Sequence, residues 1–146
     1  MATRTTAVLS NPGFIVDFPS VDRSTGRQVN WALVPAGYQN ENGKKEIPAG
    51  TVMSEDDNGQ VYPRADADTG TNPTHTARFI AETNMVEDEK EAALSGYGMI
   101  LGGAFYENLL PDSTGTPKQL PADFVTELRA SGTGYAFEQY TDSRLS

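Results

Sequence analysis

Short apolar runs, each ended by glycine, proline or other turn residues, recur along the chain and predict a mainly β protein. Runs rich in β-branched and aromatic residues are typical of strands, and such frequent turn residues leave little room for long helices. The longest run is interrupted by Gly102-Gly103, where we expect a bulge, a bend or a tight turn. The runs that we expect to form strands are residues 14–18, 47–63 as a hairpin, 76–82, 97–106 and 135–140.

The clearest local signal is the hairpin over residues 47–63. Pro48 fixes one backbone angle and Gly50 tolerates a positive φ, so a turn is expected there, directly ahead of a short strand. Asn58-Gly59 is a preferred sequence for folding a strand back on itself. This segment therefore predicts a structural module and not an active site.

One helix is expected, over residues 121–131. Pro121 suits a first helical turn, and Gly132 follows where a helix would stop. A single apolar stripe, suited to packing on a sheet, is formed by residues spaced four apart, namely Leu120, Phe124 and Leu128. The fold class that we predict is mainly β (α+β): a small β-barrel or sandwich with one helix in the C-terminal half and an extended N-terminal arm.

Residues 1–20 are predicted to form this arm, ahead of a single β-rich domain over residues 21–146. The first 13 residues are rich in Thr and Ser and lack material for a core. Residues 14–18 are strand-like, and either pair with another chain or form an ordinary edge strand of this domain. Trp31 is the single tryptophan, and a tryptophan is more often a core anchor than an interface residue. The candidate partner contacts are Phe14, Ile15, Val16, Phe18 and Trp31.

Composition narrows the functional classes. The 146 residues suit one domain, and 11 basic against 20 acidic residues give a net charge of −9, which opposes nucleic acid and anionic membranes. There is no cysteine, so disulfides and thiolate chemistry are excluded. The apolar runs are far shorter than the roughly 20 residues that cross a bilayer, and residues 7–9 are too short for the core of a signal peptide. We expect the protein to stay in the cytoplasm where it is made.

No pattern of catalytic or cofactor-binding residues is found. His75 is the single histidine and lies in a polar stretch, so a solvated loop residue is favoured over a member of a catalytic triad. Residues 66–77 begin like a calcium loop, but glycine stands at the fifth position and alanine at the twelfth. The glycines near residue 98 lack the lysine of a phosphate loop. We therefore expect no enzyme, no metal and no cofactor.

Four sequence pieces, taken in order, resemble the lambda-like head decoration (capsid cementing) proteins of phages. They are I-P-A-G-T-V-M at residues 47–53 with N-G-Q-V-Y at 58–62, the strand at 76–82, the run that ends in E-N-L-L-P at 107–111, and the helix followed by G-T-G-Y-A-F-E at 132–138. Residues 20–46 do not match. The resemblance implies a structural virion protein that binds the outer capsid surface of a tailed phage as a homotrimer. It also implies that the major capsid protein is the partner and that the protein cements its subunits against the pressure of packaged DNA.

Two other functions stay open at this point. One is a different virion part, such as a tail or fibre-base component. The other is a carbohydrate-binding β-barrel, which six tyrosines and one tryptophan would suit because aromatic rings stack on sugars.

Overall fold

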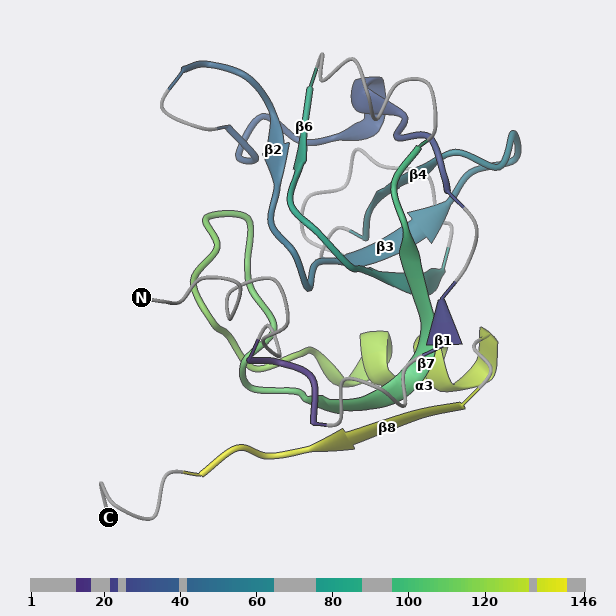
Figure 1. The fold of residues 1–146 in the computed structure, drawn as a ribbon, viewed down its shortest axis with the longest axis vertical. Helices are drawn as coiled ribbons and strands as arrows, with labels where there is room; N and C mark the ends of the chain where they lie inside the picture. Colours follow the sequence, from purple (N-terminus) through teal and green to yellow (C-terminus); the bar gives the residue numbers. More distant parts are fainter. Residues whose placement is uncertain are drawn as a thin grey trace, which may run out of the picture.

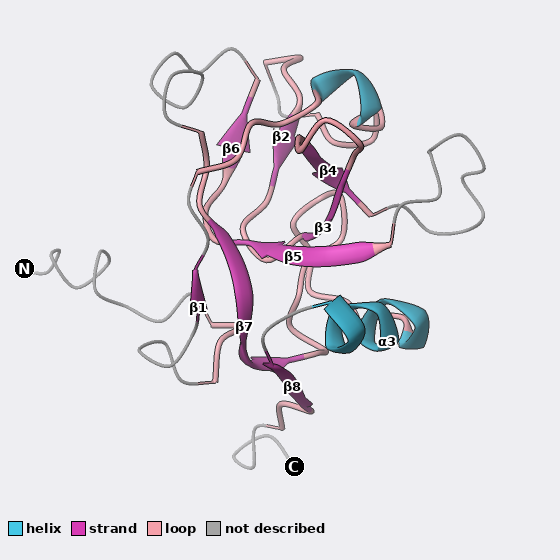
Figure 2. Ribbon diagram, turned by 90° about the vertical axis from the view of Figure 1, so that its right-hand side faces the viewer, coloured by secondary structure: helices cyan, strands magenta, loops and turns pink. Residues whose placement is uncertain are grey.

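The computed structural model describes residues 13–16, 22–23, 26–39, 42–64, 76–87, 96–131 and 134–141. These residues form a mainly β structure with two sheets and one α-helix (Figure 1; Figure 2). In chain order the elements are β1 (Asp22–Arg23), the 3₁₀-helix η2 (Trp31–Leu33), β2 (Glu46–Ile47), β3 (Val52–Glu55), β4 (Val61–Pro63), β5 (Ala77–Ala81), β6 (Met85–Val86), β7 (Met99–Tyr106), α3 (Ala122–Ser131) and β8 (Gly134–Glu138).

The larger sheet has six strands in the order β1-β7-β5-β3-β4, with β8 pairing with β7 off this path. β8 is parallel to β7, and the other pairs in this sheet are antiparallel. Strands β2 and β6 form a separate antiparallel pair. The named strands of the described residues do not close into a barrel.

Strand β7 organises the sheet because different neighbours pair with its two halves. Its first half pairs with β1 and β5, and its second half pairs with β8 from Gly102 to Tyr106. The strand is continuous through Gly102-Gly103, and Gly103 has a φ of +139°, a value that L side chains rarely adopt. The glycine pair therefore lies where the strand paired with β7 changes from β5 to β8.

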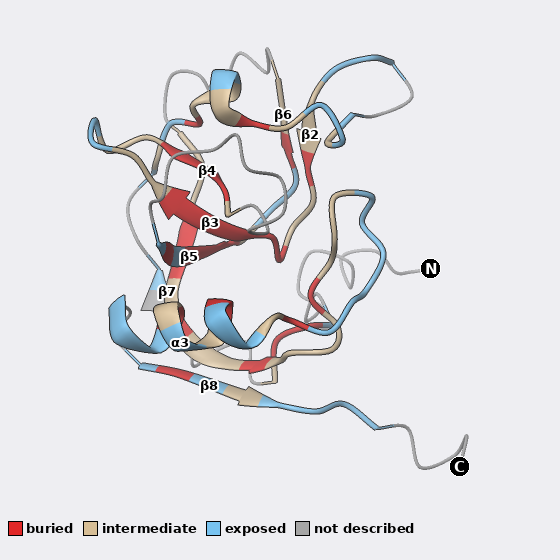
Figure 3. Cartoon of the chain, turned by 180° about the vertical axis from the view of Figure 1, so that it is seen from behind, coloured by how far each residue is buried: buried red, intermediate tan, exposed pale blue. Residues whose placement is uncertain are grey.

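The central strands β3 and β5 of the larger sheet are buried on both faces (Figure 3). In β3, Val52 points into one cluster of apolar side chains and Met53 into the other, and in β5 Ile80 and Phe79 do the same. This alternation follows from the two-residue period of a strand. The first cluster lies between the sheet and α3 and includes Phe14, Ile15, Val52, Ile80, Ile100, Phe105, Leu110, Phe124, Leu128 and Tyr135. The second includes Val29, Val34, Ile47, Met53, Val61, Phe79, Met85 and Met99.

The local predictions for the hairpin and the helix are confirmed. Strands β3 and β4 pair across a turn in which Gly59 has a φ of +81°, and Gly50 has a φ of +94° in the turn before β3. Helix α3 begins one residue after Pro121, and its residues Phe124 and Leu128 are buried against the sheet. The mainly β class with a single late helix is likewise confirmed for the described residues.

Candidate functional site

The N-terminal residues that the sequence singles out lie along β7. Phe14 and Ile15 are buried in the first cluster. The Val16 N–H donates to the Ala104 carbonyl at 2.9 Å, and the Tyr106 N–H donates to the Phe14 carbonyl at 2.8 Å. Residues 14–16 thus form an edge segment of this chain's own sheet, which was the second interpretation of this segment. Their contact with another protein stays a prediction, and Phe18 lies outside the described residues.

Trp31 opens the short helix η2 on the other side of the sheet. Its side chain is half-buried and packs against the second cluster, and its carbonyl accepts a hydrogen bond from Lys45 Nζ at 2.9 Å. A half-buried ring suits the anchoring role that the sequence favoured. The structure does not bring Trp31 together with residues 14–16, because the two pack into different clusters.

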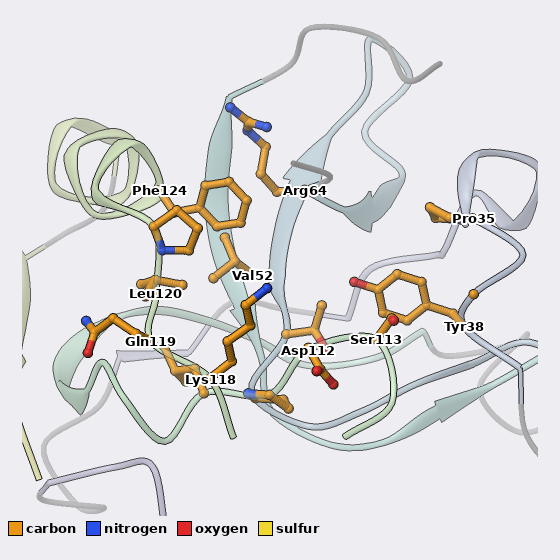
Figure 4. A pocket seen from close by; sticks show the side chains of 15 residues that line it. Pro35, Tyr38, Val52, Arg64, Asp112, Ser113, Lys118, Gln119, Leu120 and Phe124 are labelled. Atoms are coloured by element: carbon orange, nitrogen blue, oxygen red, sulfur yellow. The ribbon is translucent and has the colours of Figure 1, made fainter. Parts of the chain in front are cut away.

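A cleft of about 430 Å³ lies beside α3, between that helix, the loop that follows β7 and the segment around Tyr38 (Figure 4). Its walls are mainly apolar and aromatic, with a few polar groups among them, which is the usual composition of a binding cavity. Figure 4 shows the Lys118 side chain extending into this space. Prominent lining residues are Pro35, Tyr38, Val52, Leu120 and Phe124 on the apolar side and Arg64, Asp112 and Lys118 among the polar ones.

Arg64 lines the cleft, and its guanidinium contacts both the Glu127 carboxylate and the Phe124 ring. Its Nε and Nη2 donate to the two carboxylate oxygens of Glu127 at 2.9 and 3.0 Å, and its guanidinium lies 4.8 Å from the centre of the Phe124 ring. Glu127 Oε1 also accepts the Ala77 N–H at 2.7 Å. Hydrogen bonding to Arg64 lowers the pKa of Glu127 from its ordinary value of 4.5. The pair therefore joins β4, β5 and α3 at one point.

Asp112 shapes the opposite wall by capping its own turn. Its Oδ1 accepts the Thr114 N–H at 2.9 Å, the Thr114 hydroxyl at 2.6 Å and the Thr116 N–H at 3.1 Å. The hydrogen bond from the Thr114 hydroxyl is the largest cause that lowers the pKa of this carboxyl. Asp112 is consequently an anion at neutral pH, and its Oδ1 is hydrogen-bonded within the loop over residues 111–117.

Neither of the two carboxylates at the cleft has the raised pKa of a general acid. Both carboxylates described above accept several hydrogen bonds and have lowered pKa values, whereas a general acid at neutral pH needs a raised one. No group of three or more His, Asp or Glu side chains within the described ranges is placed to hold a metal ion. His75 and most of the calcium-like segment at 66–77 lie outside those ranges.

The sequence did not reveal this cleft. Its lining comes from four separate segments, and the distances between them depend on how the sheet folds. The run Asp112-Ser113-Thr114-Gly115-Thr116 is a recognisable turn signal and locates one wall. No local pattern connects that turn with Arg64 or Tyr38.

Comparison with protein-family models and with curated proteins found no match for this chain. None of the helices among the described residues is long and apolar enough to cross a membrane.

Proposed function

We propose that this protein is a non-enzymatic structural component of a tailed-phage virion, a head decoration protein. In this proposal it binds the outer capsid surface as a homotrimer and cements neighbouring major capsid subunits against internal DNA pressure. Its partners are the major capsid protein and two further copies of itself.

One observation carries the proposal. The sequence pieces that resemble decoration proteins fall on strands of the larger sheet and on the helix packed against it: the β3–β4 hairpin, β5, β7 with the turn after it, and α3 followed by β8. Each of these pieces contributes to the first cluster, through residues such as Val52, Ile80, Phe105, Leu128 and Tyr135. The pieces therefore belong to one packed unit, which is what a resemblance to a whole domain requires.

Two isolated bridges support the small-barrel form of the predicted fold. Val29 pairs in parallel with Val61 on β4, and Arg27 pairs with Tyr97, two residues before β7 begins. The segment over residues 27–29 thus connects the β4 edge back toward β7. In this interpretation the second cluster, which includes Val29 and Val61, fills the interior of the barrel.

The physical properties suit a cementing role. Apolar clusters pack on both faces of the central strands, and three modest contacts joined in one trimer bind at a high effective concentration. The net charge of −9 suits a protein on the outside of the shell, away from DNA.

The test is to mix the purified protein with capsids that lack it and to image the particles. We expect density repeated over the whole shell, at positions where three capsid subunits meet, and a solution mass of three chains. Density confined to the tail or to one vertex would overturn the proposal in favour of a tail or fibre-base component. Failure to bind capsids, combined with binding in a glycan screen, would instead support the carbohydrate-binding alternative.

A further inference from the structure

Strand β8 has a paired edge and an open edge. On one side, residues 134–138 pair with β7 over five consecutive positions without a register shift. On the other side, no strand or isolated bridge from the described residues pairs with it. Figure 1 shows β8 at the lower margin of the molecule, beneath β7 and α3.

The hydrogen-bond pattern identifies the main-chain groups on the open edge. The Glu107 N–H donates to the Glu138 carbonyl at 2.9 Å, so the main-chain groups of Glu138 point toward β7. Successive residues of a strand direct these groups to opposite edges. The N–H and C=O groups of Tyr135, Phe137 and Gln139 therefore point away from β7.

Side chains continue the pairing on the β7 side for two residues beyond β8. Asn108 Oδ1 accepts the Tyr140 N–H at 2.8 Å, and Asn108 Nδ2 donates to the Tyr140 carbonyl at 3.0 Å, in the manner of one more ladder pair. Gln139 Nε2 donates to Glu107 Oε1 at 2.5 Å. The Tyr140 ring packs edge-on against the Tyr106 ring, with 5.3 Å between the ring centres. Tyr140 is nonetheless 40% exposed.

The edge lacks two of the devices that commonly prevent pairing between chains. Residues 134–140 contain no lysine and no proline, and their pairing has no bulge. On the outer face the exposed residues are Gly134, which has no side chain, Ala136, whose side chain is one methyl group, and Glu138, which adds a negative charge. A preformed edge that no described strand covers, with an acidic residue on it, fits an extended segment that carries a basic residue.

We propose that the open edge of residues 135–139 accepts an extended, basic segment of the major capsid protein as an added β-strand. This inference rests on the proposed function and deepens it by naming the surface that contacts the capsid. The added strand satisfies the outward main-chain groups of Tyr135, Phe137 and Gln139, and its basic side chain lies opposite Glu138.

The decisive variant is Gln139→Pro, with Gln139→Ala as its matched control. Proline removes the outward N–H at this position but suits an edge strand, whereas alanine removes the same side chain and keeps the N–H. We expect Gln139→Pro to weaken attachment to capsids at least about tenfold in a sedimentation assay, since three edges per trimer each lose one hydrogen bond. Gln139→Ala should attach like the original chain.

A second variant, Glu138→Lys, tests the charge without touching the main chain. We expect weaker attachment and a smaller loss of binding on adding salt, because the attractive pair is removed. This variant also carries the test if circular dichroism shows that Gln139→Pro does not fold.

The outcomes separate the two proposals. If the original chain does not bind capsids, the proposed function fails. If the original chain binds and both Gln139→Pro and Glu138→Lys bind equally well, the edge inference alone fails. A folded Gln139→Pro that has lost its trimeric mass in solution would also overturn the inference, because the edge would then pair with a second copy.

Discussion

Phe14 and Gly50 lie so close together that only glycine fits at position 50. A Cβ atom at this position would come 2.9 Å from Phe14 Cε2 and 2.8 Å from Pro111 Cδ, both closer than real Cβ atoms approach. The turn ahead of β3, the N-terminal segment and the loop after β7 therefore meet at this glycine.

Gly50→Ala should lower the free energy of unfolding by about 2–4 kcal/mol. The left-handed backbone at φ +94° disfavours any side chain, and the added methyl group also overpacks the contact with Phe14 and Pro111. Gly43→Ala is the matched control, because Gly43 has a φ of +76° but nothing within 4 Å of its Cβ position. Urea unfolding should show a loss of only about 1 kcal/mol there. Equal losses at both positions would contradict the close packing at Gly50.

Glu127→Gln should destabilise the protein at neutral pH by about 1–3 kcal/mol, because charge-assisted hydrogen bonds from Arg64 are lost. Hydrogen bonding to Arg64 lowers the folded-state pKa of Glu127, so its contribution is present above the ordinary value of 4.5 and is lost as the pH falls below it. The variant should therefore lose less stability on acidification than the original chain.

Urea unfolding at a series of pH values between 7 and roughly 2 measures this difference. Arg64→Ala provides a second check, since it removes the partner and should flatten the same part of the curve. An undiminished dependence on pH in both variants would show that Glu127 does not contribute through this pair.

Leu128→Ala should cost about 2–5 kcal/mol, because this side chain is fully buried between α3 and the sheet and its removal leaves a cavity. Val125→Ala on the same helix removes a half-buried side chain and should cost about 1 kcal/mol. Thermal unfolding of the two variants under identical conditions compares them. A larger loss at Val125 would mean that the helix packs with a different face.

Deletion of residues 1–12 should leave the free energy of unfolding unchanged and abolish or strongly weaken attachment to capsids. The deletion spares Phe14 and Ile15, which belong to the first cluster, so a loss of attachment would report on contact and not on folding. A Phe14→Ala chain, which should lose about 3–5 kcal/mol of stability, serves as the contrasting variant. If the shortened chain attaches normally, the predicted arm has no role in binding.

The sequence predicted the elements whose signals are local. The β3–β4 hairpin was predicted from Asn58-Gly59, and α3 from an apolar stripe and from the glycine at position 132 in the sequence, signals that each lie within a few residues of the element. Strands β1, β2 and β6 were not foreseen, because each has only two residues and two residues carry no periodicity.

The long-range relationships could not be predicted for a different reason. Residues 14–16 have the same strand-like composition whether they pair with β7 or with another chain, so composition alone left both possibilities open. The cleft depends on the spacing between Tyr38, Arg64 and Lys118, which only the folded sheet determines. The open edge of β8 likewise follows from which strand lies beside it.

The two ends of the described chain meet on a single strand, since Ile15 bridges Phe105 on one side of β7 and Phe137 pairs with the same residue on the other. Contacts between residues so distant in sequence slow folding, because a long loop must close before they form. A nascent chain cannot complete this sheet until β8 has left the ribosome. Folding of this sheet therefore follows synthesis of β8, and a truncated product that lacks β8 would leave the edge of β7 unpaired and Phe105 without the Tyr135 and Phe137 rings that pack against it.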